Sequence, residues 1–102
     1  MDKHEIDIKK VLKSTAADND KKGDKIYNEI FNIINNGGGE IILDFNGINI
    51  MNTAFLNNAI GKLYSIDDWN SANFEIKLVN FSQDTLDLIK EVIDSAREKY
   101  RV

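Results

Sequence analysis

The sequence contains no cysteine and a single histidine, His4, among 102 residues. The absence of cysteine excludes disulfide bonds, thiolate zinc sites and a cysteine nucleophile, and it is typical of proteins from a reducing cytoplasm. With one histidine near the N-terminus and no cysteine, neither a Ser-His nor a Cys-His nucleophile pair has an obvious setting. We therefore expect no enzyme active site, no metal and no cofactor.

Long apolar runs are also absent from the sequence. No segment approaches the roughly 20 apolar residues that a membrane-spanning helix requires. The first ten residues, MDKHEIDIKK, contain no hydrophobic signal core. These two observations predict a soluble cytoplasmic protein without a membrane partner.

An excess of positive charge is missing as well, because the formal net charge is -4. Nucleic-acid binding requires a basic stripe that displaces counterions from phosphates. Lysines are more frequent in the first 25 residues than in the rest of the chain, but acidic residues lie among them, so this stretch is nearly neutral. We expect a solvated surface of mixed charge and no nucleic-acid partner. The length and the 42% apolar content predict one globular domain over residues 1–102.

Three segments have the apolar patterns of strands. Residues 5–12 and 74–79 alternate between apolar and polar side chains, as strands with one wet face do. Residues 40–46 are almost continuously apolar, which predicts a central strand covered on both faces. The Asn46-Gly47 pair then turns the chain, and a hairpin to residues 48–51 is an alternative at this point.

Apolar side chains at helical spacing predict helices over residues 24–36, 53–66 and 82–99. The intervening segment 13–23 is strongly polar and is expected to form a loop, long enough to contain a further short strand. Residues 67–73 form a second polar loop that contains Trp69. The resulting order β-α-β-α-β-α predicts an α/β fold, with a small, mostly parallel or mixed sheet and helices packed on it.

Two segments resemble catalytic or ligand-binding features, and both have a simpler structural interpretation. The run Asn35–Gly39 follows a helix and precedes a strand, the reverse of a phosphate-binding loop, so it is interpreted as a helix stop. Asp44 lies at the carboxyl end of the central strand, where α/β folds bind ligands. No second carboxylate is close in sequence, which favours a role in accepting backbone N–H bonds across the following turn.

The segment Asn52–Phe55 is the more promising site. It begins the second predicted helix, where backbone N–H groups are unpaired and the helix dipole favours negative charge. From residue types alone, Asn52 or Thr53 is expected to cap this helix.

Residues 41–63, IILDFNGINIMNTAFLNNAIGKL, resemble the core segment of the STAS-like domain family, which is related to the STAS domains of anti-sigma-factor antagonists. The similarity extends over roughly residues 23–96. It rests on an apolar strand ending in Asp-Phe-x-Gly, a short hydrophobic stretch, and a small or hydroxyl-bearing helix start with phenylalanine. The residues that carry this pattern are Asp44, Phe45, Gly47, Ile48, Thr53, Ala54 and Phe55.

The resemblance implies a non-catalytic domain that signals through protein contacts. In the antagonists, a serine that follows an Asp-Ser pair at this helix start is phosphorylated by a partner kinase. Here Asn52 aligns with the aspartate, Thr53 with the first serine and Ala54 with the phosphorylated serine, so the phosphoacceptor is missing. The implied partner is a histidine-kinase-type ATPase or an anti-sigma factor.

Three hypotheses for function therefore remain open. The first is a protein-interaction module whose contact surface consists of Asn46, Gly47, Asn52, Thr53, Ala54 and Phe55. It predicts an exposed apolar patch around Ile50, Met51 and Phe55. The second is a sensor that binds a small anionic ligand at the same helix start, in a closed pocket. The third is a small hydrolase that uses Asp44, which would need a base or metal beside it.

Overall fold

The computed structural model describes residues 2–65 and 74–100. Its main sheet has three parallel strands in the order β1-β3-β5, and a second, two-stranded parallel sheet joins β2 and β4. The elements are, in chain order, β1 (Lys3–Asp7), α1 (Ile8–Leu12), β2 (Ala16–Ala17), α2 (Asp20–Asn35), β3 (Gly39–Asp44), β4 (Ile50–Met51), α3 (Thr53–Ala59), the 3₁₀ segment η1 (Gly61–Ser65), β5 (Phe74–Val79) and α4 (Gln83–Tyr100). The predicted α/β class is confirmed.

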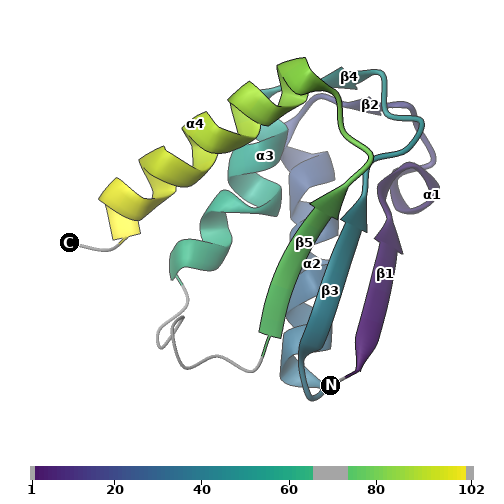
Figure 1. The fold of residues 1–102 in the computed structure, drawn as a ribbon, viewed down its shortest axis with the longest axis vertical. Coiled ribbons are helices and arrows are strands. Elements are labelled where there is room, and N and C mark those ends of the chain that lie inside the picture. The colour runs from purple at the N-terminus through teal and green to yellow at the C-terminus, as the bar shows by residue number, and fades with distance from the viewer. Residues whose placement is uncertain (1, 66–73, 101–102) are drawn as a thin grey trace.

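Within residues 2–65 and 74–100, helices cover only one face of the main sheet (Figure 1). Each strand is followed along the chain by its direct neighbour in the sheet, so every crossover helix lies on the same side. The small β2-β4 sheet and the first turn of α4 lie beyond the carboxyl ends of the main strands (Figure 1). This end of the molecule is the one at which the predicted functional segment lies.

Strand β3 is internal, as predicted, but only one of its faces is fully covered. It pairs with β1 on one side and with β5 on the other. Ile41 and Leu43 are wholly buried, whereas Glu40, Ile42 and Asp44 are half-buried on the opposite face. The expectation of two covered faces was wrong, because the crossover helices among the described residues all pack on the other side of the sheet.

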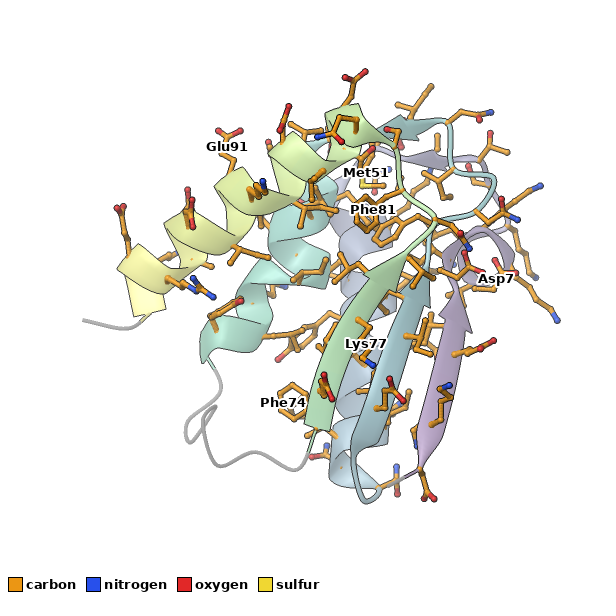
Figure 2. The ribbon with its side chains drawn as sticks, viewed as in Figure 1. Asp7, Met51, Phe74, Lys77, Phe81 and Glu91 are labelled. Atoms are coloured by element: carbon orange, nitrogen blue, oxygen red, sulfur yellow. The ribbon has the colours of Figure 1, made fainter. Side chains whose placement is uncertain are left out.

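The open face of the sheet is stabilised by a cross-strand ion pair. The Nζ of Lys77, which points away from the helices (Figure 2), lies 2.6 Å from Oε1 of Glu40. The hydrogen bond from Lys77 lowers the pKa of Glu40, and Glu40 in turn raises the pKa of Lys77. This pair explains why a charged side chain is tolerated on an internal strand.

The first predicted strand, residues 5–12, is wrong beyond residue 7. The chain leaves β1 at Asp7, whose Oδ1 accepts a hydrogen bond from the Lys10 N–H at 3.2 Å and so caps a short helix. Ile8 and Leu12 are four residues apart and both face the core. Helix α1 ends at Lys13, which adopts the left-handed conformation with φ 54°.

The predicted loop 13–23 also contains regular structure. It includes β2, the further strand considered possible, and the first turn of α2. The cap of α2 is Asn19, whose side chain accepts from the Lys22 N–H at 2.8 Å, so the assignment of helix 24–36 began four residues late. Gly23 lies inside α2, at a point where α2 and α3 approach each other too closely for a larger side chain. A Cβ at this position would lie 2.5 Å from the Phe55 carbonyl oxygen.

The second predicted helix, 53–66, is divided into two parts. Helix α3 ends at Ala59, and η1 follows from Gly61. Gly61 faces Val92 and Ala96 of α4, with a hypothetical Cβ 3.6 and 3.9 Å from them. The third helix begins as expected, after Ser82, whose Oγ accepts from the Thr85 N–H at 3.2 Å.

Because only one face of β3 is fully buried, we expect substitutions at adjacent positions of the strand to lower the unfolding free energy by different amounts. Leu43→Ala should cost about 2–5 kcal/mol of unfolding free energy, because it removes a wholly buried side chain and leaves a cavity. Ile42→Ala, on the open face of the same strand, is the matched control and should cost less than about 1.5 kcal/mol. Urea unfolding of the three proteins measures both values. Equal costs would contradict the one-sided core.

Candidate functional site

Beyond β3, the chain makes a turn that Asp44 stabilises. Oδ1 of Asp44 accepts hydrogen bonds from the Asn46 N–H and from Nδ2 of Asn80, each at 2.9 Å. The Ile48 N–H then donates to the Phe45 carbonyl at 3.0 Å and closes the turn around Gly47. The predicted turn-stabilising role of Asp44 is confirmed.

The chain does not form the alternative hairpin after this turn. Strand β4 pairs in parallel with β2, with Ala16 opposite Ile50 and Ala17 opposite Met51. Next to this pair of strands, the Thr15 carbonyl accepts a hydrogen bond from the Asn49 N–H at 2.8 Å, which supports the pairing. The turn therefore leads away from the main sheet and towards the start of α3.

Asn52 fixes the start of α3 and confirms the predicted cap. Its Oδ1 accepts from the Phe55 N–H at 3.0 Å, and its Nδ2 donates to the Asp18 carbonyl at 2.8 Å. Its own N–H donates to the Ala17 carbonyl at 3.3 Å. One side chain thus joins α3 to the segment that precedes α2.

The predicted contact residues divide into surface and core. Asn46, Gly47 and Ala54 are exposed, and Asn52 and Thr53 are half-buried. Phe55 is 0% exposed and belongs to the hydrophobic core. Its assignment to the contact surface was wrong, because the first turn of α3 places its side chain underneath the helix.

Strand β4 supplies the apolar part of the surface. Ile50 is 58% exposed and is, with Phe31, one of the two exposed large apolar side chains among the described residues. Its neighbour Met51 points the other way, toward Phe81 and the start of α4 (Figure 2). Of the predicted apolar patch, only Ile50 is exposed, since Met51 is half-buried and Phe55 is buried. We call the set Asn46, Gly47, Ile50, Thr53 and Ala54 the strand-end surface.

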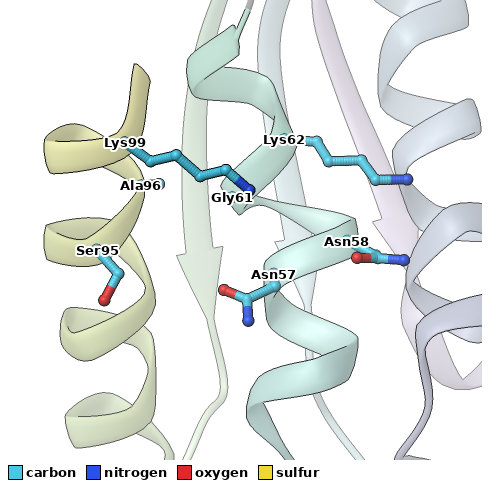
Figure 3. Close-up of a pocket in the computed structure, with 7 residues that line it drawn as sticks. All are labelled: Asn57, Asn58, Gly61, Lys62, Ser95, Ala96 and Lys99. Atoms are coloured by element: carbon cyan, nitrogen blue, oxygen red, sulfur yellow. The ribbon is translucent and has the colours of Figure 1, made fainter. Parts of the chain in front are cut away.

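A second feature is a groove between α3, η1 and α4, with a volume of about 410 Å³ (Figure 3). Its lining includes Lys62, whose Nζ lies 2.6 Å from Oδ1 of Asp24, and Asn58, which donates to the same oxygen at 3.1 Å. The hydrogen bond from Lys62 lowers the pKa of Asp24. Asn58 joins α3 to α2, and Lys62 joins η1 to α2, so the contacts of these polar groups have a structural explanation.

Comparison with known families identifies the fold. Residues 22–86 match the family described as a STAS-like domain of unknown function (DUF4325). The chain belongs to this STAS-like family. The match includes the whole strand-end surface, whereas β1, α1 and β2 precede it. No curated protein and no solved structure matches the chain.

Residues 2–65 and 74–100 contain neither a candidate metal site nor a candidate membrane-spanning helix. In that part of the STAS-like domain, no three His, Cys, Asp or Glu side chains are grouped so that they could hold a metal ion. No helix there has both the length and the apolar character that crossing a membrane requires. The predicted loop 67–73 with Trp69 lies outside the described residues.

The role of Asn52 can be tested by its removal. Asn52→Ala should lower the unfolding free energy by about 1–2 kcal/mol, because it removes the helix cap and the bond to the Asp18 carbonyl. The matched control is Asn57→Ala, at an exposed position inside the same helix, where alanine should be neutral or slightly stabilising. Chemical unfolding measures both variants. A loss for Asn57→Ala as large as that for Asn52→Ala would contradict the capping role.

Proposed function

We propose that this STAS-like domain is a non-catalytic regulatory module that binds a protein partner through its strand-end surface. The observation that carries the proposal is the exposure of Ile50, 58%, at the end of the domain where α/β folds place their functional loops. An apolar side chain at this position can serve as the anchor of a contact, because interface anchors are buried on binding and are surrounded by a polar rim.

The backbone around Ile50 is held in place before any partner arrives. Asn52 makes three hydrogen bonds through its side chain and its backbone N–H immediately after β4, and Asp44 stabilises the turn before it. A preformed surface loses little conformational entropy on binding, so more of the contact energy appears as affinity. Complete burial of an isoleucine side chain contributes about 1.5–3 kcal/mol, and Ile50 can supply part of that amount.

The partner class comes from the resemblance to anti-sigma-factor antagonists. It indicates a histidine-kinase-type ATPase or an anti-sigma factor as the protein that docks here. Because Ala54 occupies the phosphoacceptor position, we propose binding without a phosphorylation switch at that residue. Thr53, the half-buried residue next to Ala54, carries a hydroxyl group within the strand-end surface.

The alternative, an anion sensor at the start of α3, has less support. Helix α3 has only seven residues, and Asn52 already accepts the Phe55 N–H that an anion would need. The hydrolase hypothesis has little support as well, because Oδ1 of Asp44 already accepts hydrogen bonds from Asn46 and Asn80. Neither the sensor nor the hydrolase is favoured by a specific contact.

The proposal is tested with a purified ATPase-domain protein of the histidine-kinase type, which is the partner class that the resemblance indicates. Ile50→Asp and Thr53→Glu should each raise the Kd by at least about tenfold, equivalent to about 1.4 kcal/mol. Thr53→Glu should change the unfolding free energy by less than about 0.5 kcal/mol, since negative charge is tolerated in a first helical turn. Isothermal titration calorimetry and chemical unfolding provide the two numbers.

The matched control is Asn28→Glu, which places the same charge on an exposed position of α2, away from the strand-end surface. It should leave the affinity unchanged. If Asn28→Glu weakened binding as much as Thr53→Glu, or if neither strand-end variant changed the affinity, the contact would not lie on this surface.

A further inference from the structure

A shallow groove of about 540 Å³ lies beside the strand-end surface. It forms where α1 follows β1 and ends at the left-handed residue Lys13. Its lining is basic and hydroxylic apart from one aspartate, and consists of Asp7, Lys9, Lys10, Lys13, Ser14 and Thr15. This segment precedes the region matched by the STAS-like family, so the groove is not part of the matched pattern.

The lysines of the groove concentrate positive charge on an acidic chain. Lys9, Lys10 and Lys13 are all exposed, and none forms an ion pair with another described residue. The one acidic group in the lining, Asp7, caps α1 through Oδ1. The net charge of the whole chain is -4. The three lysines therefore form a local cationic site, which attracts anionic groups although the chain as a whole is acidic.

The groove is continuous with the strand-end surface through two contacts. Thr15 lines the groove, and its carbonyl accepts the N–H groups of Asn49 at 2.8 Å and Ile50 at 3.4 Å. The stem of Lys9 lies against Gly47, where a Cβ would be 2.8 Å from Lys9 Cδ. A bound segment that covers Ile50 can therefore reach the lysines.

We propose that the partner presents an acidic segment to this groove, with carboxylates at Lys9 and Lys13 and an apolar side chain against Ile50. This inference rests on the proposed function and names the chemistry of its partner. A protein segment is favoured over nucleic acid, because the net charge is negative, the groove contains Asp7, and no aromatic side chain lines it for base stacking.

The test is an NMR titration of the full chain with a synthetic peptide of Glu, Leu, Ser and Gly. Chemical-shift changes should concentrate in residues 9–15 and 46–51. The affinity should fall at least about threefold when NaCl rises from about 50 to about 300 mM, as expected for exposed charges. The counterpart peptide with Lys in place of Glu should not bind.

Two double variants that remove the same charge distinguish binding in this groove from a general effect of the protein's charge. Lys9→Gln combined with Lys13→Gln should weaken the acidic peptide at least about fivefold, with the melting temperature checked by circular dichroism. Lys21→Gln combined with Lys25→Gln removes the same charge from exposed positions of α2 and should leave binding unchanged. Equal losses in the two pairs, absence of acidic-peptide binding, or tighter binding of an oligothymidylate would overturn the proposal.

The same variants distinguish this inference from the proposed function. If the ATPase-domain protein still needs Ile50 but binds Lys9→Gln/Lys13→Gln with unchanged affinity, the acidic segment is wrong and the strand-end surface stands. If the acidic peptide binds the groove while Ile50→Asp leaves the partner's affinity unchanged, the strand-end proposal is the one that fails.

Discussion

The central strand β3 hydrogen-bonds to a parallel strand on each side, and its Ile41 and Leu43 side chains are wholly buried beneath the helices. This one-sided burial fixes the register, because a slip of one residue would exchange the buried pair for Glu40 and Ile42. The Lys77–Glu40 pair then stabilises the face that no helix covers. The positions of α2, α3 and α4 follow from the need to cover the apolar face.

The same arrangement determines where function can lie. Parallel strands bring their carboxyl ends to one edge, and here that edge holds the Asn46-Gly47 turn, the β2-β4 sheet and the capped start of α3 (Figure 1). The open sheet face, by contrast, presents mainly charged side chains. An exposed isoleucine on a hydrogen-bonded frame, next to a cationic groove, is a better docking surface for a protein than for a small ligand.

Sequence reasoning predicted the parts of this structure that depend on one strong local pattern. The central position of β3, strand β5, the cap of α3 at Asn52 or Thr53, and the Asp44 turn were all predicted correctly. It failed where two patterns overlapped: Ile6 and Ile8 alternate as in a strand, but Ile8 and Leu12 also have helical spacing, and the Asp7 cap decides between them. Phe55 was misplaced because its burial depends on how α3 packs. The lysine groove was missed because residues 1–25 are nearly neutral in sequence, and only the fold gathers Lys9, Lys10 and Lys13 in one groove that has a single acidic residue in its lining.

The central claim is that partner contacts are made at the carboxyl ends of the strands and not on the open face of the sheet. Hydrogen–deuterium exchange, measured on the chain alone and when saturated with the ATPase-domain protein, tests it most directly. We predict slower exchange on binding in residues 44–55, with exchange in β5 unchanged. Slower exchange in β5 and the outer edge of β1, without any change in residues 44–55, would contradict the account.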